Sequence, residues 1–348
     1  MMPKVCVIQP ILASYRDPIF RELNHLLGNE LLVCASPAPT GFGRIQNPVY
    51  EIHDPGWKKL GMFSYMPVQS LRQLLRRSDR FIHFGDFKFL SLWFLMFYCF
   101  FSHKKLWLHG QGGYKRSGPL HRLVYSLSVF LCEGYICYTE YSAQALKKIL
   151  PRSLRHKVIV VSNTLAMEPA ECHRNPETGS SLLYIGRLRK GCGIELLLES
   201  AARLKLTVKV IGEGPAGYVD KLKAQFPSAR FYGGVFDPQQ QEDIARDCMA
   251  GVYGGDAGLS VVHYMALGLP VIVHGDIKKH MGPEPSYVVD GVNGLVFLRG
   301  DVESLVNCIA QLRDSKALRQ SLGEGALETF KRLMKPSMAQ KLARILEN

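Results

Sequence analysis

The sequence lacks the cysteine and aspartate spacings that mark common metal and redox sites. Its nine cysteines are scattered, their number is odd, and none forms a C-x-x-C pair. We therefore interpret the thiols as small core residues of a protein from a reducing compartment. An Asp-x-Asp metal motif is also absent. We expect neither a metal nor a cofactor.

Glycine is missing after the first predicted strand, VCVIQP at 5–10, which continues into Ile11 and Leu12. A dinucleotide-dependent oxidoreductase would carry G-x-G-x-x-G there, with an acidic residue about 20 positions later. We therefore set that class aside. A nucleic-acid binder is suggested only by the net charge of +13. Zinc motifs and the aromatic signatures of RNA modules are absent, so no nucleic-acid partner is expected.

The sequence has no apolar run of the roughly 20 residues that a spanning helix needs. The run FLSLWFLMFYCFF at 89–101 is shorter. It favours a helix buried between a sheet and its neighbours. The alternative is a monotopic segment that dips into one leaflet. Just after this run, the segment from Ser102 to Lys157 contains ten Lys and Arg but only two acidic residues, Glu133 and Glu140. In the alternative, these cations hold acidic headgroups.

The 348 residues exceed the size at which one core usually stops growing, so two domains are expected. Predicted strands alternate with helical patterns on both sides of a polar, turn-rich linker at 166–180. The predicted strands are 5–10, 31–35, 80–84, 106–110, 135–139, 158–162, 182–186, 207–212, 230–234, 250–254, 270–273 and 294–297. A helix at 17–27 begins with Asp17 as N-cap and Pro18 as first helical residue.

This alternation predicts an α/β fold of two Rossmann-like parallel-sheet domains that face each other across a cleft. The first domain comprises residues 1–165, and a helix at 336–348 packs back on it. The second comprises residues 166–335.

The stretch GGDAGLSVVHYMALGLPVIV at 254–273 reads as a glycine-rich turn, a short helix, a stop at Gly268 and a strand. The start of such a helix leaves backbone N–H groups unpaired, and its dipole favours negative charge. A phosphate fits there. Taken alone, the stretch also suits an ordinary strand–helix–strand unit.

Ligands of parallel sheets bind beyond the carboxyl ends of the strands. The residues that follow the predicted strands include GRLRKG at 186–191, GEGP at 212–215, HGQGG at 109–113 and YTE at 138–140. Small glycine loops, cations and a histidine therefore gather at one edge. Backbone donors with Arg and Lys suit a diphosphate.

The blocks GRLRKG, GEGP, GLSVVHYMALGLPVIV and VVDGVNGLVF resemble the C-terminal domain of family 4 retaining glycosyltransferases of the GT-B fold. The resemblance covers residues 181–298. It is looser in the N-terminal half, through HGQGGYK, CYTEYSAQAL and VIVVSNTLA. It implies transfer of a sugar from a nucleotide-sugar donor, with retention and without an obligatory metal. The donor then binds the C-terminal domain and a glycan acceptor the N-terminal one.

The resemblance also implies residue roles. His109 and Asp256 are the expected catalytic residues. The expected donor-binding residues are Gly186, Arg187, Lys190, Gly212, Glu213, Gly214, Gly255, Ala257, Gly258, Leu259, Ser260 and His263. On the acceptor side we expect Gly112, Tyr114, Lys115 and Arg116. The His109 imidazole is expected to face the cleft, where it binds a sugar hydroxyl or accepts a proton at modest cost, since its ordinary pKa is near 6.5.

The sequence departs from the family pattern at three positions. The family's two donor-loop glutamates correspond to Gly255 and His263, and the lysine of its GR block corresponds to Cys192. Asp256 is the nearby acid that can replace the first glutamate. His263 is interpreted equally as a ribose or phosphate contact and as a core-helix histidine. Lys190 lies two residues before the family's lysine position, so Arg187 is the safer phosphate ligand.

No side chain stands out as a nucleophile, so the resemblance implies front-face substitution, in which the departing phosphate deprotonates the acceptor. The basic region after 101 suggests a lipid-linked acceptor on an anionic membrane. We therefore expect a cytoplasmic enzyme of surface polysaccharide or lipopolysaccharide biosynthesis, peripheral on the inner membrane face. The N-terminus leads directly into a strand, so no signal peptide is expected. The alternative is a non-catalytic or weakened GT-B-like protein that binds a sugar nucleotide or an anionic partner.

Overall fold

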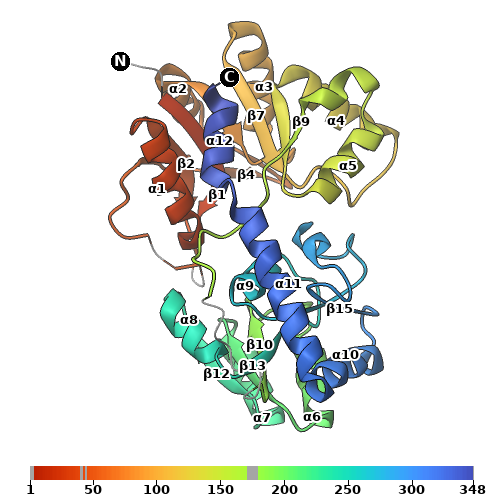
Figure 1. Ribbon diagram of the computed structural model, residues 1–348. Coiled ribbons are helices and arrows are strands. Elements are labelled where there is room, and N and C mark those ends of the chain that lie inside the picture. The colour runs from red at the N-terminus through yellow and green to blue at the C-terminus, as the bar shows by residue number, and fades with distance from the viewer. Residues whose placement is uncertain (1–3, 40–41, 44, 171–178, 348) are drawn as a thin grey trace. The chain divides into compact units, whose positions relative to one another are not determined.

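The computed structural model describes residues 4–39, 42–43, 45–170 and 179–347. It divides into two compact units, which are described separately (Figure 1). Unit 1 comprises Met1–Ala166 and Pro336–Asn348, and unit 2 comprises Met167–Lys335. Each is a parallel sheet covered by helices, so the predicted class of two α/β parallel-sheet domains is confirmed.

Unit 1 contains a seven-stranded parallel sheet in the order β3-β2-β1-β6-β7-β8-β9. The strands are β1 (Lys4–Leu12), β2 (Leu31–Pro37), β3 (Glu51–His53), β6 (Ser78–His83), β7 (Lys105–Gly110), β8 (Gly134–Cys137) and β9 (Val158–Val160). The helices are α1 (Asp17–Leu26), α2 (Val68–Arg77), α3 (Leu90–Ser102), α4 (Pro119–Leu131), α5 (Glu140–Ile149) and α12 (Met338–Glu347), with short 3₁₀ turns η1 (Ser14–Arg16) and η2 (Arg152–Lys157).

Alternate residues of the first strand serve two separate cores, one on each face of the sheet. Val5 and Val7 pack with α1 and α12, including Leu23 and Leu342. Cys6 and Ile8 pack on the other face, which α2, α3, α4 and α5 cover. Both faces of the sheet are therefore buried, as parallel sheets require.

Unit 2 contains a six-stranded parallel sheet in the order β12-β11-β10-β13-β14-β15. Its strands are β10 (Ser181–Ile185), β11 (Thr207–Ile211), β12 (Arg230–Gly233), β13 (Cys248–Val252), β14 (Val271–His274) and β15 (Gly294–Phe297). Its helices are α6 (Ile194–Arg203), α7 (Ala216–Gln225), α8 (Pro238–Ala245), α9 (Ser260–Ala266), α10 (Val302–Asp314) and α11 (Lys316–Met334), with the 3₁₀ turn η3 (Glu284–Tyr287). The predicted turn, helix, stop and strand at 254–273 correspond to α9, Gly268 with φ 64° and β14.

All predicted strands overlap an observed one, and the chain adds β3 and the antiparallel pair β4 (Lys58–Leu60) and β5 (Phe63–Tyr65). Each of these strands has three residues, none of them buried, which is too short for an apolar alternation to be recognised. The predicted N-cap of α1 was wrong. Asp17 is the first helical residue, and its carboxylate accepts hydrogen bonds from Arg21 Nε at 2.6 Å and Tyr50 Oη at 2.8 Å.

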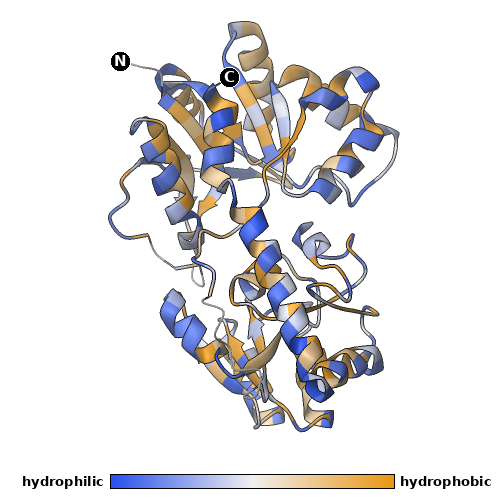
Figure 2. Cartoon of the chain, viewed as in Figure 1, coloured by the Kyte–Doolittle hydropathy of each residue, from blue (hydrophilic) through white to orange (hydrophobic). Residues whose placement is uncertain are grey.

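The apolar run at 89–101 forms α3, which has one buried and one exposed face. Leu92, Leu95, Met96 and Cys99 are buried, whereas Phe94, Phe97, Tyr98, Phe100 and Phe101 are exposed. The interpretation of α3 as a fully buried helix was therefore wrong for half of its surface. Figure 2 shows how hydrophobic residues concentrate in the strands and in α3. Among the described residues, no helix combines the length and apolarity needed to cross a bilayer.

The eight described cysteines are buried, and none of them forms a disulfide with another described residue. This agrees with their interpretation as small core residues. Burial also raises the pKa of the Cys34, Cys99 and Cys137 thiols to about 12, so these groups stay protonated.

Candidate donor and acceptor sites

The candidate donor site in unit 2 lies where strands of its parallel sheet end. Gly186 and Arg187 follow β10, Gly212 follows β11, and Gly254 to Asp256 follow β13 after a single residue. The carboxyl ends of parallel strands share one edge of a sheet. The structure therefore brings the predicted donor residues of these three loops to a common edge.

Two of these loops pack backbone against backbone. A Cβ on Gly255 would lie 2.5 Å from Gly191 O, and one on Gly193 would lie 2.0 Å from Gly255 N. Gly193 also has φ 70°, which L side chains rarely adopt. The position of the family's first glutamate therefore has no room for any side chain.

A lysine would not fit at Cys192 either, the position that the resemblance aligns with the lysine of the GR block. Cys192 lies between the two glycines of that loop and is 0% exposed, inside the core of unit 2. A lysine there would place its ammonium group in an apolar core. Arg187 and Lys190 have exposed side chains, and Arg189 Nη2 contacts Met281 Sδ. The loop therefore carries its cations before Cys192.

Backbone donors at the start of α9 are fewer than the sequence predicts. Asp256 N donates to Gly191 O at 3.3 Å, and Ala257 N donates to His280 Nδ1 at 3.0 Å. These two amides already have hydrogen-bond partners within the unit. The amides of Gly258, Leu259 and Ser260 donate no hydrogen bond within the described residues. They form a row of three donors where α9 begins.

Asp256 is tied into a network that the sequence did not predict. Its carboxylate accepts hydrogen bonds from Arg299 (Nε–Oδ1 3.1 Å, Nη2–Oδ2 3.2 Å) and from His274 Nε2 (3.2 Å to Oδ1). Burial raises the pKa of the Asp256 carboxyl, but the bonds from Arg299 and His274 outweigh it and hold the pKa below its ordinary value. Asp256 is therefore ionised at neutral pH and fixed in orientation.

Two stacked histidines hold this loop. The rings of His274 and His280 lie 3.7 Å apart with an interplanar angle of 6°. His280 Nδ1 accepts from Ala257 N, so its Nε2 carries the proton and donates to His274 O at 2.9 Å. His274 Nδ1 accepts from Asp276 N at 3.2 Å, which leaves its Nε2 to donate to Asp256. Both tautomers are thus set by the backbone.

His274 and Arg299 were missed although they lie at the carboxyl ends of β14 and β15. The rule that identified the other loops applies equally to these two strands. His280 offered no such signal, because it lies six residues beyond β14.

His263 is buried in α9, with 9% of its surface exposed. Burial lowers the pKa of its imidazole to about 4, so the ring is neutral at neutral pH. Its Nε2 has no hydrogen-bond partner among the described residues. A histidine that serves only the core normally satisfies both nitrogens.

In unit 1, His109 lies near the end of β7 and is 3% exposed. Its ring contacts Tyr138 edge-on at 4.9 Å, and no described residue bonds its Nε2. Burial, assisted by the charge of Arg16, lowers the pKa of His109 to about 3. The prediction that His109 accepts a proton at modest cost was therefore wrong. The neutral imidazole remains able to form a hydrogen bond.

Arg16, which the sequence analysis did not single out, belongs to the same edge of unit 1. Its Nη1 lies 3.3 Å from Met338 Sδ, and its Nη2 donates to Asn163 Oδ1. Asn163 N donates to Tyr138 O at 2.9 Å, which links this group to His109. Arg16 forms no ion pair with a carboxylate of the described residues. Its charge is therefore open to an anionic group.

The predicted acceptor residues lie in the loop that follows β7. Gly112 has φ 70°, and its N–H donates to Tyr135 Oη at 3.3 Å. Tyr114 is buried, with Lys115 Nζ 5.8 Å from its ring centroid, and the Lys115 and Arg116 side chains are exposed. The loop thus presents two cations on a fixed backbone.

One family model matches part of the chain. Residues 179–315 match the family model described as "Glycosyl transferases group 1". This range includes all predicted donor residues. No curated protein matches the chain.

Several solved structures share the fold. Anabaena HepE in complex with UDP has a TM-score of 0.69 at 15% identity, covering 99% of this chain and 100% of that one. Sucrose-phosphate synthase from Thermosynechococcus elongatus has a TM-score of 0.69 at 14% identity, covering 99% and 98%. The lipopolysaccharide outer core galactosyltransferase WaaB has a TM-score of 0.62 at 12% identity, covering 96% and 99%. The fold is therefore that of GT-B glycosyltransferases.

Proposed function

We propose that this chain is a hexosyltransferase-type glycosyltransferase that binds a nucleotide-sugar donor in unit 2 and transfers the sugar with retention and without a metal. The observation that carries the proposal is the coincidence of two findings. The segment that matches group 1 glycosyl transferases contains a row of three unpaired amides at Gly258 to Ser260 and the exposed cations Arg187 and Lys190. The HepE structures contain UDP or UDP-glucose, which makes uridine nucleotides the first donors to try.

In this proposal the leaving diphosphate takes the negative charge that develops in the transition state. The amides of Gly258, Leu259 and Ser260 point their partial positive charge at it, together with Arg187 and Lys190. Gly186, Gly212, Glu213 and Gly214 line the neighbouring strand ends. The departing phosphate then deprotonates the acceptor hydroxyl on the same face of the sugar, so no protein nucleophile is required.

We assign Asp256 to the donor sugar, in place of the glutamate for which Gly255 leaves no room. Arg299 and His274 hold its carboxylate ionised and in one orientation. Preorganised groups of this kind cost little reorganisation during the reaction. His263 is assigned to the nucleotide, because its unpaired Nε2 lies on the helix that begins at the three free amides.

On the acceptor side we assign His109 a hydrogen bond to a sugar hydroxyl as a neutral imidazole. Gly112, Tyr114, Lys115 and Arg116 form the acceptor loop, and Arg16 adds a charge without a carboxylate partner. These cations favour an acceptor with an anionic group, such as a lipid-linked diphosphate sugar. We accordingly propose surface polysaccharide or lipopolysaccharide synthesis by a cytoplasmic enzyme on the inner membrane face.

A second candidate is a weakened or non-catalytic GT-B-like protein that binds a sugar nucleotide. The observation in its favour is that both oxygens of Asp256 already accept hydrogen bonds from Arg299. In that case the carboxylate orders the loop and does not contact the sugar.

A ligand screen followed by an activity assay separates these candidates. UDP-, GDP-, ADP- and CMP-sugars are tested for thermal stabilisation, because a ligand that binds only the folded state raises Tm. The best donor is then assayed for hydrolysis and for transfer to a membrane lipid extract. Binding with turnover supports the transferase, binding without turnover supports the second candidate, and no stabilisation by any sugar nucleotide contradicts both.

A further inference from the structure

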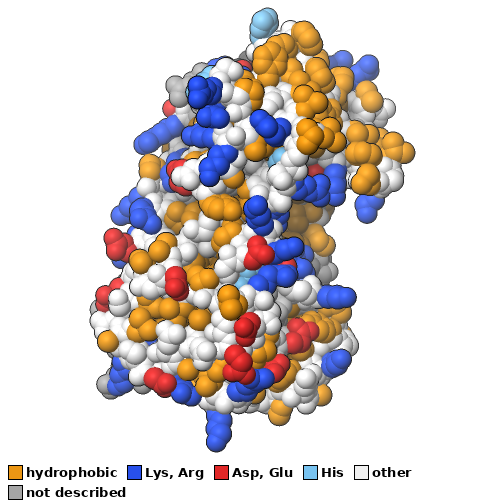
Figure 3. Space-filling view, turned by 90° about the vertical axis from the view of Figure 1, so that its right-hand side faces the viewer, with side chains coloured by type: hydrophobic (Ala, Val, Ile, Leu, Met, Phe, Trp, Pro, Cys, Tyr) orange, Lys and Arg blue, Asp and Glu red, His pale blue; other side chains and the backbone are white. Residues whose placement is uncertain are grey.

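The exposed side of α3 joins that of α4 in one apolar surface, which we call the aromatic face. It consists of Phe94, Phe97, Tyr98, Phe100 and Phe101 of α3 and Leu120, Leu123 and Phe130 of α4. Phe100 and Phe130 join the two helices, with ring centroids 5.6 Å apart. Figure 3 shows hydrophobic side chains gathered on the upper part of unit 1.

Helical spacing places these side chains on the outer surface of their helices. Phe94, Phe97, Tyr98 and Phe101 follow the i, i+3, i+4, i+7 pattern, and Phe94 stacks on Tyr98 with centroids 5.9 Å apart. The opposite side of α3 already packs on the sheet of unit 1. The packing of α3 on the sheet therefore does not account for the exposed parts of these aromatic rings.

The exposure of this face is larger than scattered surface hydrophobics explain. Phe101 is 76% exposed, Leu120 72%, Leu123 64%, and Phe94 and Phe130 52% each. A contiguous apolar patch of this kind marks an interaction surface. Aromatic rings are also the side chains that concentrate at the boundary between lipid and water.

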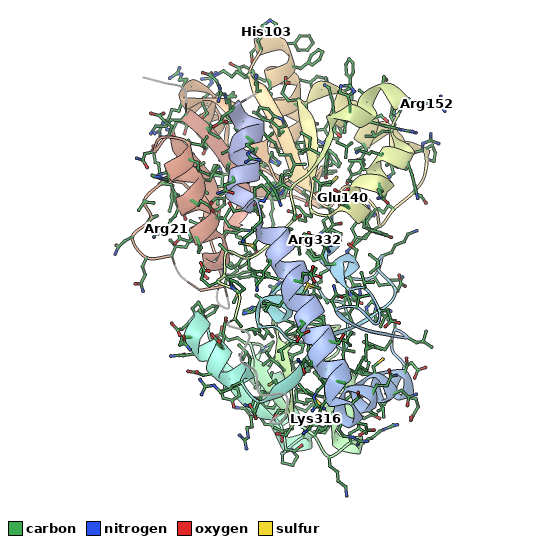
Figure 4. All side chains as sticks on the ribbon, viewed as in Figure 1. Arg21, His103, Glu140, Arg152, Lys316 and Arg332 are labelled. Carbon is green, nitrogen blue, oxygen red and sulfur yellow. The ribbon has the colours of Figure 1, made fainter. Side chains whose placement is uncertain are left out.

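Basic residues outnumber acidic ones beside the face, although the exposed Glu133 lies two residues after α4. Neither α3 nor α4 contains Asp or Glu. Arg122 lies on α4 between Leu120 and Leu123 and forms no ion pair with a described residue. Lys157 Nζ lies 2.8 Å from Cys132 O and 3.4 Å from Phe130 O, also without a carboxylate among the described residues. In Figure 4, His103 lies at the end of α3 and Arg152 at the outer edge of unit 1.

Lys104 differs from Arg122 and Lys157 because it pairs with a carboxylate, although Lys157, like Lys104, donates to backbone carbonyls of unit 1. Lys104 Nζ donates to Leu75 O at 2.7 Å, to Ser78 O at 2.8 Å and to Asp79 Oδ1. Its ammonium group is therefore occupied by hydrogen bonds within unit 1. The cations that border the aromatic face are Arg122 and Lys157.

We propose that the aromatic face inserts into the headgroup region of an anionic bilayer and that Arg122 and Lys157 contact lipid phosphates at its border. Apolar insertion combined with basic residues is how interfacial helices bind membranes. A second copy of the chain is a poorer occupant, because it would bring two positive borders together. The proposal concerns unit 1 alone and holds whether or not unit 2 transfers a sugar.

Vesicle flotation at low and high salt tests the proposal. The full chain is mixed with vesicles of phosphatidylcholine alone or of phosphatidylcholine with phosphatidylglycerol. The double variant Phe97→Ser/Phe101→Ser is compared with Phe236→Ser, which replaces a 51% exposed phenylalanine of unit 2. We expect wild type and Phe236→Ser to float with the anionic vesicles and to retain part of their binding in high salt. The double variant should lose at least tenfold in bound fraction at both salt concentrations.

Three results would overturn the proposal. One is vesicle binding by the double variant equal to that of wild type. Another is binding that salt abolishes completely, since this indicates adsorption through charge alone. The third is a concentration-dependent dimer that the double variant abolishes, with no vesicle binding by either protein. Thermal stabilisation by the best nucleotide sugar is measured on the same samples. It should be unchanged in the double variant, so failure of membrane binding is separable from failure of donor binding.

Discussion

At the scale of single residues, the candidate sites depend on buried polar groups whose protonation is set by their surroundings. Asp256 is kept ionised by Arg299 and His274, whereas His109 and His263 are kept neutral by burial. These properties need tertiary contacts and were invisible in the sequence. The positions of His274 and Arg299 at strand ends were visible, because the same rule had identified Arg187 and Gly212.

The low pKa of His109 predicts an acid-sensitive unit 1. Its folded-state pKa of about 3 lies below the unfolded value of about 6.5, so between these values the unfolded chain binds more protons. Stability therefore falls as the pH is lowered through this range. For one such histidine the loss between about pH 7 and pH 5 is about 2 kcal/mol. Denaturant unfolding of His109→Gln should show a flatter pH profile than wild type by this amount, and parallel profiles would contradict the assignment.

Asp256→Asn tests whether this carboxylate contacts the donor sugar. The amide keeps the size of the side chain but removes the charge that pairs with Arg299. We expect sugar transfer to fall by at least tenfold, because a charge-assisted hydrogen bond contributes about 1.5–3 kcal/mol. Affinity for the free nucleoside diphosphate should change little. Equal losses in transfer and in nucleoside diphosphate binding would instead indicate that Asp256 orders the loop.

At the scale of elements, the strands were predictable and the orientation of α3 was not. Runs such as VIVVS and TVKVIG are rich in β-branched residues and end in a polar residue or glycine, which predicts buried strands. The α3 sequence is apolar on all sides, so its 3.6-residue periodicity does not distinguish the packed side from the exposed one. The β4–β5 hairpin was missed because strands of three residues are too short to show an apolar pattern.

The backbone contact between the 191–193 and 254–256 loops predicts that side chains are not tolerated at Gly255. Gly255→Ala and Gly255→Glu should both lower Tm and weaken nucleotide-sugar binding, since their Cβ would meet Gly191 O at 2.5 Å. Restoring the family's glutamate should therefore not raise activity. Gly258→Ala is the matched control in the same loop, because its Cβ would lie 3.6 Å from Met281 Cβ. Full stability of Gly255→Glu would show that the loops separate readily.

At the scale of the whole molecule, the C-terminal segment belongs to the unit that contains the N-terminus. Met338, Leu342 and Leu346 of α12 pack with α1 and with Val5 and Val7 of the first strand. The linker at 166–180 lies partly outside the described residues, so its predicted character stays a prediction. Two sheets were predictable from the repeated alternation of strands and helices. From the sequence we also expect a helix at 336–348 to pack on the first domain, although no local pattern encodes that contact.

Removing α12 should therefore destabilise unit 1 and leave unit 2 folded. Truncation before Met338 exposes the apolar face formed by α1 and the sheet, including Leu23. Burial of each large side chain in such a face contributes about 1.5–3 kcal/mol. Hydrogen exchange should show loss of protection across β1, β2 and α1 but not across β10 to β15. Uniform loss across both units would contradict independent cores.

The central claim is that unit 2 binds a nucleotide sugar through the loops at its strand ends. Isothermal titration of the donor found by the thermal screen tests this directly, with wild type, Arg187→Ala and the control Arg246→Ala. Arg246 directly follows α8, is exposed and forms an ion pair with Asp243 of that helix. It lies outside the proposed site. We predict that wild type and Arg246→Ala bind with equal affinity and that Arg187→Ala binds at least tenfold more weakly, since a phosphate contact contributes about 1.5–3 kcal/mol. Equal affinity of Arg187→Ala and wild type would contradict the account.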